Sequence, residues 1–213
     1  MNDVAAIRKE YTLRDLDVFQ VAENPINQFK KWFQEALDAE LQEPNAMNVS
    51  TVSSEGKPTS RILLLKGIEE NGFIFYTNYD SRKGKELATN PYICLNFFWA
   101  GLERQVRIEG KVNKVSKEIS EKYFHSRPRS SQIGAHVSPQ SQVLKSRDEL
   151  VEKEKELIVK FEGQTVPLPD HWGGYLVKPT HIEFWQGRPS RLHDRIVYKL
   201  QNEGNWQINR LAP

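Results

Sequence analysis

Residues 47–78 read MNVSTVSSEGKPTSRILLLKGIEENGFIFYTN, and this stretch decides the fold. Short runs rich in Val, Ile, Leu, Phe and Tyr alternate with the turn sequences SEGKP and EENG. Such runs between turn residues are typical of β-strands joined by hairpins. The stretch therefore predicts a meander of antiparallel strands rather than the βαβ units of a parallel sheet.

The same pattern of short apolar runs continues towards the C-terminus. Further strands are expected in YICLNFFW, RQVRIEGKVNKV, GGYLVKPTHIEFWQG, RLHDRIVYKLQ and WQINRL. Helices are expected from the cap at Asn24 and Pro25 through Leu41, from Ser81 to Pro91, over KEISEKYFHS, and over residues 146–162. RPRSSQIGAHVSPQSQ is expected to be a polar loop. This order favours a mostly β (α+β) protein, an antiparallel barrel with peripheral helices, over a doubly wound sheet.

The composition bounds the class of protein. The chain has 213 residues, with 30 Lys and Arg against 28 Asp and Glu and a formal charge of +2. That balance gives no global attraction for nucleic acid, and no apolar run approaches the roughly 20 residues of a membrane span. The N-terminus does not resemble a secretory signal. We expect a cytoplasmic protein without nucleic-acid or membrane partners, with residues 1–22 as a mobile arm and residues 23–213 as a single domain.

Several classes of site are absent from the sequence. There is no G-x-G-x-x-G, Walker A or G-x-S-x-G motif, which disfavours a Rossmann site, a P-loop and a serine-hydrolase elbow. The five His residues are scattered without the spacing of a metal site, so no metal is expected. The single Cys94 excludes a disulfide framework within the chain, and its apolar surroundings favour a core residue over a nucleophile.

Two clusters of basic residues lie in the first half of the chain. In RILLLK, Arg61 and Lys66 have opposite parity on a regular strand, so either a bulge intervenes or they serve different ligands. Solubilising charges at the two strand ends are an equal alternative. Arg82 and Lys83 occupy the first turn of the helix after Ser81, where the helix dipole disfavours cations. An external phosphate at that turn is favoured over two tolerated surface charges.

A third cluster lies in YFHSRPRSSQIG, where donors surround a proline. Tyr123, Arg127 and Ser131 supply phenol, guanidinium and hydroxyl groups, a combination that suits a second anion pocket. Arg129 belongs to the same segment, although a role facing solvent fits it equally well.

The fourth cluster is EFWQGRPSRLHDR, residues 183–195. Arg191, His193 and Arg195 alternate, so on a strand they share one face. The neighbouring Trp and Gln suit a planar, anionic ligand. For a generic basic strand, ordinary solvated charge is the alternative.

The sequence resembles the pyridoxine/pyridoxamine 5′-phosphate oxidase family in RILLLK, YTNYDSRKGKEL, RQVRIEGKV, YFHSRPRSSQIGAHVSPQSQ, WGGY, IEFWQGRPSRLHDR and the terminal RLAP. The match runs from about Pro25 to Pro213. The resemblance implies an FMN-binding split β-barrel that works as a homodimer, with the flavin at the subunit interface. It also implies oxidation of pyridoxamine or pyridoxine 5′-phosphate to pyridoxal 5′-phosphate, with O2 reduced to H2O2, in vitamin B6 biosynthesis and salvage.

The resemblance also assigns site residues. Flavin contacts fall on Arg61, Ile62, Leu63, Leu64, Leu65, Lys66, Tyr76, Thr77, Arg82, Lys83, Gln105, Gln140, Ser141, Trp185 and Arg195. Substrate contacts fall on Lys66, Tyr123, Arg127, Ser131, Arg191, Leu192 and His193, with Arg8 and Tyr11 from the arm. Arg191 and His193 are the expected catalytic residues. The parity conflict then resolves, because Arg61 serves the flavin and Lys66 the substrate phosphate. Gln142 and His136 depart from the family's usual serine and tryptophan.

Two other classes of function remain open on the sequence. One is a flavin reductase of the same barrel type that uses NAD(P)H, and the other is a non-catalytic module that stores flavin or pyridoxal phosphate. An assay that compares turnover of pyridoxine phosphate and O2 with oxidation of NADH distinguishes the oxidase from the flavin reductase. A bound chromophore without peroxide on adding substrate identifies the second. A nucleic-acid-binding barrel is disfavoured because basic residues alternate with acidic ones.

Overall fold

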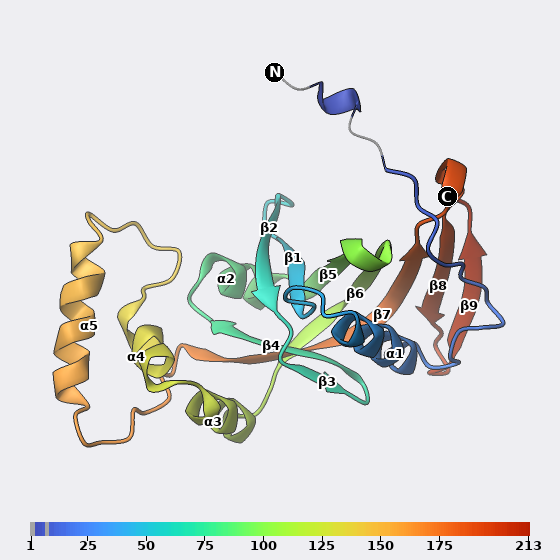
Figure 1. Ribbon diagram of the computed structural model, residues 1–213. Helices are drawn as coiled ribbons and strands as arrows, with labels where there is room; N and C mark the ends of the chain where they lie inside the picture. Colours follow the sequence, from blue (N-terminus) through green and yellow to red (C-terminus); the bar gives the residue numbers. More distant parts are fainter. Residues whose placement is uncertain (1–2, 7–8) are drawn as a thin grey trace.

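The computed structural model describes residues 3–6 and 9–213, and this part of the chain forms one antiparallel sheet of nine strands with five α-helices around it (Figure 1). The strands are β1 (Ala46–Val52), β2 (Pro58–Leu64), β3 (Gly67–Glu69), β4 (Gly72–Asn78), β5 (Tyr92–Trp99), β6 (Arg104–Lys114), β7 (Trp172–Gln186), β8 (Asp194–Leu200) and β9 (Trp206–Leu211). The helices are α1 (Pro25–Asp38), α2 (Arg82–Thr89), α3 (Lys117–Ser126), α4 (Arg129–Val137) and α5 (Asp148–Lys160). The predicted antiparallel barrel with peripheral helices is confirmed.

The long strand β7 organises the sheet. It pairs with β6 along most of its length, its first half also pairs with β4, and its second half pairs with β8. The strand order is β2-β1-β5-β6-β7-β4-β3, with β8 and β9 branching from β7. The sheet therefore divides at β7, and Figure 1 shows α3, α4 and α5 near one end of this strand and β8 and β9 at the other. The result is a split barrel.

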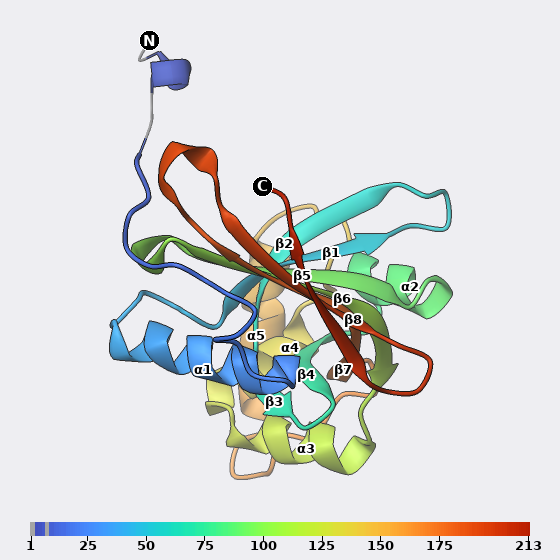
Figure 2. The same cartoon turned by 90° about the vertical axis from the view of Figure 1, so that its right-hand side faces the viewer.

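The main core lies between α1 and the inner face of the sheet (Figure 2). Asn24 caps α1 by accepting hydrogen bonds from two backbone N–H groups of the first turn, as expected. Phe29 is fully buried, and its ring centroid lies 4.8 Å from that of Phe73 and 5.0 Å from that of Phe97. In β5 and β6, alternate apolar residues enter this core, which leaves the intervening residues, mostly polar but including Phe98, on the outer face of the sheet.

A second apolar cluster joins α3, α4, α5 and the start of β7, and it corrects one expectation. Residues 127–142, expected to be a loop, contain α4. The helix forms because Ile133 is buried in this cluster, beside Phe124 of α3. Arg129 fixes the start of α4, since its guanidinium donates hydrogen bonds to the backbone carbonyls of Phe161 and Gln164 after α5.

The segment before β8 corrects a second expectation. Residues 191–193 were expected in a strand, yet Pro189–Arg191 form a 3-10 turn, η3, and the strand starts only at Asp194. Ser190 and Arg191 have φ values of 57° and 62°, in the left-handed region that a strand does not visit. A proline followed by two such residues ends the extended run after β7.

No helix in the described ranges is long and apolar enough to span a bilayer. Before α1, the chain is tied to β8, because the Tyr198 hydroxyl donates a hydrogen bond of 2.7 Å to the carbonyl of Ala22.

Candidate functional site

The first part of the site is a cationic cluster, defined as Arg61, Arg82 and Lys83 with the carboxylate of Glu86. Arg61 extends from β2, and the other residues lie on α2, whose N-cap Ser81 accepts a hydrogen bond from the N–H of Gly84. The predicted start of this helix is confirmed. The cluster carries three cations and one carboxylate, so it has an excess of two positive charges beside the N-terminus of a helix.

Lys83 is the buried member of the cluster, with 7% of its surface exposed. Its ammonium donates to Gln140 Oε1 at 2.6 Å, to Thr77 Oγ1 at 3.0 Å and to Ser81 Oγ at 3.2 Å. Burial lowers the pKa of Lys83 to about 8, and the positive charge of Arg61 acts in the same direction. The structure thus brings the predicted residues Thr77, Lys83 and Gln140 together. Ser141, with φ at 72°, follows in the turn.

Glu86 organises the arginines, and the sequence interpretation missed it. Its carboxylate accepts a hydrogen bond from Arg82 Nε at 3.0 Å and lies 3.6 Å from Arg61 Nη2. The hydroxyl groups of Thr51 and Thr59 also donate to it, at 2.5 and 2.8 Å. Burial acts to raise the pKa of Glu86, but these hydrogen bonds outweigh it and leave the pKa below its ordinary value. The i, i+4 spacing from Arg82 was the available sequence signal.

The outer part of the RILLLK segment is exposed. Ile62 and Leu64 are 65% and 36% exposed, Leu63 is half-buried, and Leu65 lies in the core. Because β2 ends at Leu64, Lys66 lies beyond the strand, and the parity argument does not apply to it. The exposed Lys66 side chain lines a pocket of about 580 Å³ together with residues of α1.

A group of aromatic rings with one arginine lies beside the second apolar cluster. We call it the aromatic group and define it as Tyr76, Tyr123, Trp172 and Arg127. The rings of Tyr76 and Tyr123 stack with centroids 3.8 Å apart, and the guanidinium of Arg127 lies 4.7 Å from the centroid of Trp172. Among the described residues, nothing accepts a hydrogen bond from the buried Nη1 of Arg127. Burial lowers the pKa of Arg127, as expected for a cation withdrawn from water. Ser131 lies half-buried on α4.

The second part of the site is at the other end of β7, and we call it the His193 pocket. It has a volume of about 400 Å³ and is lined by Lys9, Glu10, Tyr11, Arg188, Ser190, Arg191 and His193. The ring of Trp185 packs against that of His193, with their centroids 4.6 Å apart. Leu192 is 69% exposed beside it. Arg8 lies outside the described residues.

The protonation of His193 follows from its hydrogen bond. The backbone N–H of Arg188 donates to His193 Nδ1 at 3.1 Å, so the neutral ring carries its proton on Nε2. Burial lowers the pKa of His193, and the charge of Arg191 lowers it further. A neutral imidazole with its proton on Nε2 is therefore the favoured form near neutral pH.

Arg195 does not continue a row with Arg191 and His193, which corrects the prediction. Its guanidinium turns to the buried Glu183, with Nε 2.8 Å from Oε1, and it donates to the carbonyl of Ala212 at 2.8 Å. Arg195 instead lies opposite Trp185, which lies opposite Gln105. These three predicted residues thus form a row across β8, β7 and β6.

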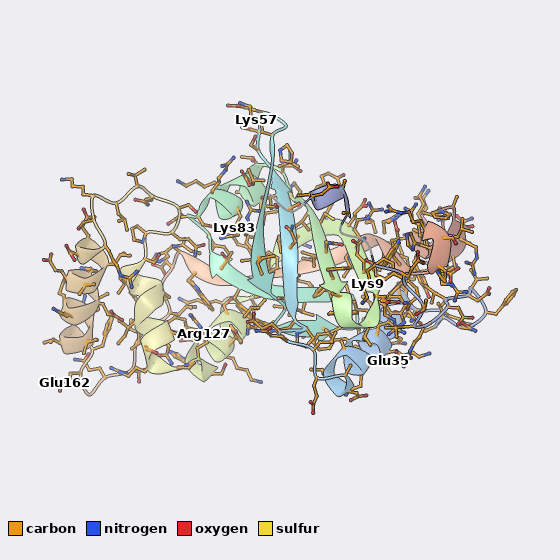
Figure 3. The ribbon with its side chains drawn as sticks, turned by 45° about the horizontal axis from the view of Figure 1, so that its top comes forward. Lys9, Glu35, Lys57, Lys83, Arg127 and Glu162 are labelled. Atoms are coloured by element: carbon orange, nitrogen blue, oxygen red, sulfur yellow. The ribbon has the colours of Figure 1, made fainter. Side chains whose placement is uncertain are left out.

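The two parts of the site are far apart within one chain. Trp172 of the aromatic group and Trp185 of the His193 pocket lie 13 residues apart on β7, and a strand of that length extends about 40 Å. Figure 3 shows the same separation. Lys83 and Arg127 lie towards the end of the molecule near α3, α4 and α5, which we call the helical end, and Lys9 lies towards the opposite end. One chain therefore presents two separate groups of predicted residues.

Comparisons with known proteins identify the family. The family model "Pyridoxamine 5′-phosphate oxidase" matches residues 33–158, and the model "Pyridoxine 5′-phosphate oxidase C-terminal dimerisation region" matches residues 172–213. A pyridoxine/pyridoxamine 5′-phosphate oxidase of Paraburkholderia phytofirmans is 54% identical over the full length of both chains.

Solved structures agree with this match. PhzG from Burkholderia lata, in complex with tetrahydrophenazine-1-carboxylic acid, has a TM-score of 0.89 and 28% identity over 95% of this chain and 100% of its own. A pyridoxamine 5′-phosphate oxidase-related, FMN-binding protein from Nostoc punctiforme shares the fold, with a TM-score of 0.71 and 13% identity over 91% of this chain and 100% of its own. The chain belongs to the pyridoxamine 5′-phosphate oxidase family.

Proposed function

We propose that this protein is an FMN-dependent oxidase that converts pyridoxamine 5′-phosphate and pyridoxine 5′-phosphate to pyridoxal 5′-phosphate. The alcohol and O2 give the aldehyde and H2O2, while the amine also consumes water and releases ammonia. The observation that carries the proposal is the presence of two separate donor sets for anions, the cationic cluster and Arg127, in a member of this family. Such donor sets suit a cofactor and a substrate that each bear a phosphate.

The cationic cluster fits the phosphate of FMN. Its excess of two positive charges matches a phosphate dianion, and the N–H groups of the first turn of α2 add donors. We assign the phosphate to Arg61, Arg82 and Lys83. The remaining flavin contacts are proposed for residues 61–66, Tyr76, Thr77, Gln105, Gln140, Ser141, Trp185 and Arg195. When bound, FMN accepts two electrons from the substrate and passes them to O2.

The aromatic group fits the phosphate of the substrate. A buried guanidinium donor without an acceptor costs free energy, and a phosphate oxygen removes that cost. We assign this phosphate to Arg127 and Tyr123, with Ser131 and Lys66 as further donors. Holding the phosphate fixes the direction in which the rest of the substrate extends.

Arg191 and His193 orient the reacting end of the substrate. Because Nδ1 of His193 is occupied by the N–H of Arg188, its Nε2–H donates a hydrogen bond to the oxygen or nitrogen on C4′. Arg191 lines the same pocket, and its charge adds to the effect of burial in lowering the pKa of His193, which favours the neutral imidazole. Leu192, Tyr11 and Arg8 complete the proposed substrate contacts.

The complete site requires a homodimer, because each substrate must meet the aromatic group of one chain and the His193 pocket of another. The match of residues 172–213 to a dimerisation region supports this arrangement. The exposed Ile62, Leu64 and Phe98 also support it, since exposed apolar side chains mark association surfaces. Analytical ultracentrifugation of the flavin-loaded protein should give a dimer with two FMN molecules. A monomer that retains FMN would contradict the shared site.

One experiment tests the reaction. The purified protein should show the flavin absorption bands, and anaerobic addition of pyridoxamine 5′-phosphate should bleach them. Admission of O2 should restore the bands and release one H2O2 for each pyridoxal phosphate formed. Bleaching by NADH but not by the B6 phosphate would favour a flavin reductase. Bands that neither reagent changes would indicate a storage module.

A further inference from the structure

Glu103 is a buried carboxylate that joins the segment before α1 to the barrel. It lies in the β5–β6 connection with 3% of its surface exposed and φ at 55°. Its Oε2 accepts hydrogen bonds from the backbone N–H groups of Thr12 at 2.8 Å and Leu13 at 3.1 Å. The ammonium of Lys9 lies 3.5 Å from Oε1. One side chain of the barrel thus makes three contacts with residues 9–13, the part of the N-terminal arm that is called the arm below.

The backbone of Glu103 is itself fixed to the end of β7. Its carbonyl accepts hydrogen bonds from the N–H of Gly187 at 2.7 Å and from Nε2 of Gln186 at 3.2 Å. Gln186 is fully buried. The carboxylate therefore projects from a rigid part of the sheet, which suits an anchor for a segment without secondary structure of its own.

The arm residue next to this anchor is Tyr11, which forms a wall of the His193 pocket. Its ring meets those of Trp185 and His193 edge-on, with centroids 5.7 and 5.8 Å away. It also packs on Gly187 so closely that a Cβ at that position would lie 2.7 Å from Tyr11 Cγ. The position of Tyr11 thus depends on the adjacent hydrogen bonds to Glu103 and on the absence of a side chain at residue 187.

We propose that Glu103 is a positioning residue for the substrate: it anchors the arm and thereby fixes Tyr11 as one wall of the His193 pocket. The inference deepens the proposed function and rests on it for the identity of the substrate. Glu103 touches neither Arg191 nor His193 through a hydrogen bond or ion pair among the described residues, so it acts through Tyr11. Its removal should weaken substrate binding more than it slows turnover.

Hydrogen exchange tests the anchor without reference to activity. In the wild-type protein the amides of Thr12 and Leu13 should be protected from exchange. Glu103→Ala should reduce their protection about tenfold or more, because two N–H groups lose a charged acceptor. Glu103→Gln should have a smaller effect, since an amide oxygen still accepts a hydrogen bond. Unchanged protection in Glu103→Ala would overturn the anchor.

Steady-state kinetics with pyridoxamine 5′-phosphate test the effect on the pocket. Glu103→Ala should raise KM about tenfold and change kcat by less than about twofold. Gly187→Ala should raise KM similarly by displacing Tyr11, while Thr12 and Leu13 stay protected. Because both variants act on the same wall, the double variant should be little worse than either single one. Arg14→Ala, which removes the exposed ion pair of Arg14, just after the arm, with Glu35, should leave KM unchanged.

The outcomes separate the two proposals. Lost protection with an unchanged KM would refute the positioning role, as would additive effects in the double variant. If Glu103→Ala does not fold, Glu103→Gln and Gly187→Ala still decide the matter, because an unchanged KM in both would refute it. A wild-type protein that does not oxidise the substrate would refute the proposed function, and exchange at Thr12 and Leu13 would still decide whether Glu103 is an anchor.

Discussion

Raising the pH above 8 should weaken FMN binding, because Lys83 loses its charge there. Burial and Arg61 lower the pKa of Lys83 to about 8 from an ordinary 10.5. The phosphate of FMN is a dianion throughout this range, and the arginine guanidinium groups stay charged. Bound phosphate favours the protonated ammonium, so the free protein must take up a proton to bind FMN at high pH. The affinity should fall by up to about tenfold for each pH unit above 8.

The stability of the flavin-free protein should respond in the opposite direction. The folded pKa of Lys83 lies below the unfolded one, so between pH 8 and 10.5 the unfolded chain binds more protons than the folded chain. The contribution of Lys83 to the free energy of unfolding therefore rises with pH across this window. These opposite trends distinguish titration of Lys83 from general alkaline unfolding, which would lower both the affinity for FMN and the stability of the flavin-free protein.

Quenching of flavin fluorescence measures the affinity at each pH. Lys83→Met should weaken FMN binding at pH 7 by about 10- to 100-fold, the loss expected for a hydrogen bond to a charged group, and should abolish the slope above pH 8. Riboflavin, which lacks the phosphate, serves as the control and should show no slope with either protein. An affinity for FMN that stays constant from pH 7 to 9.5 in the wild type would refute the reasoning.

Three further substitutions test other parts of the structure. His193→Gln should lower kcat about 100-fold with unchanged FMN content, and an unaltered kcat would remove His193 from the reaction. Arg127→Met should raise KM for the substrate about tenfold without lowering the melting temperature of the free protein, because it removes a buried donor that has no acceptor among the described residues. Phe29→Ala should cost about 3–5 kcal/mol in urea unfolding, since the ring is fully buried between α1 and the sheet.

Much of the fold could be predicted from local patterns. The turns SEGKP and EENG delimit strands in the sequence, and Asn24 and Ser81 are helix caps whose hydrogen bonds lie within one turn. The helix α4 was not predicted because its sequence is short and polar. It becomes helical only when Ile133 is buried against residues more than 20 positions later in the chain, such as Leu157 and Phe161. The strand expected at residue 191 failed for a local reason, since Ser190 and Arg191 adopt φ values that their residue types rarely take.

The site was less accessible to prediction than the fold. The proposed flavin and substrate residues came from the family resemblance, and their roles stay predictions. Glu86 and Glu103 were missed because acidic side chains on a charged surface and in a buried network look alike in sequence. Only the fold shows that Glu86 meets Thr51 and Thr59 and that Glu103 meets Thr12, about 90 residues away in the chain. Long-range partners of this kind leave no periodic signal.

The length of β7 has a consequence for mixtures of defective chains. If each reaction centre combines the helical end of one chain with the opposite end of another, Lys83→Met and His193→Gln damage different halves. A pair made of one chain of each kind would hold one centre with both defects and one with none. Co-expression of the two variants should therefore restore activity that neither has alone, whereas two defects at the same end of β7 should not rescue each other.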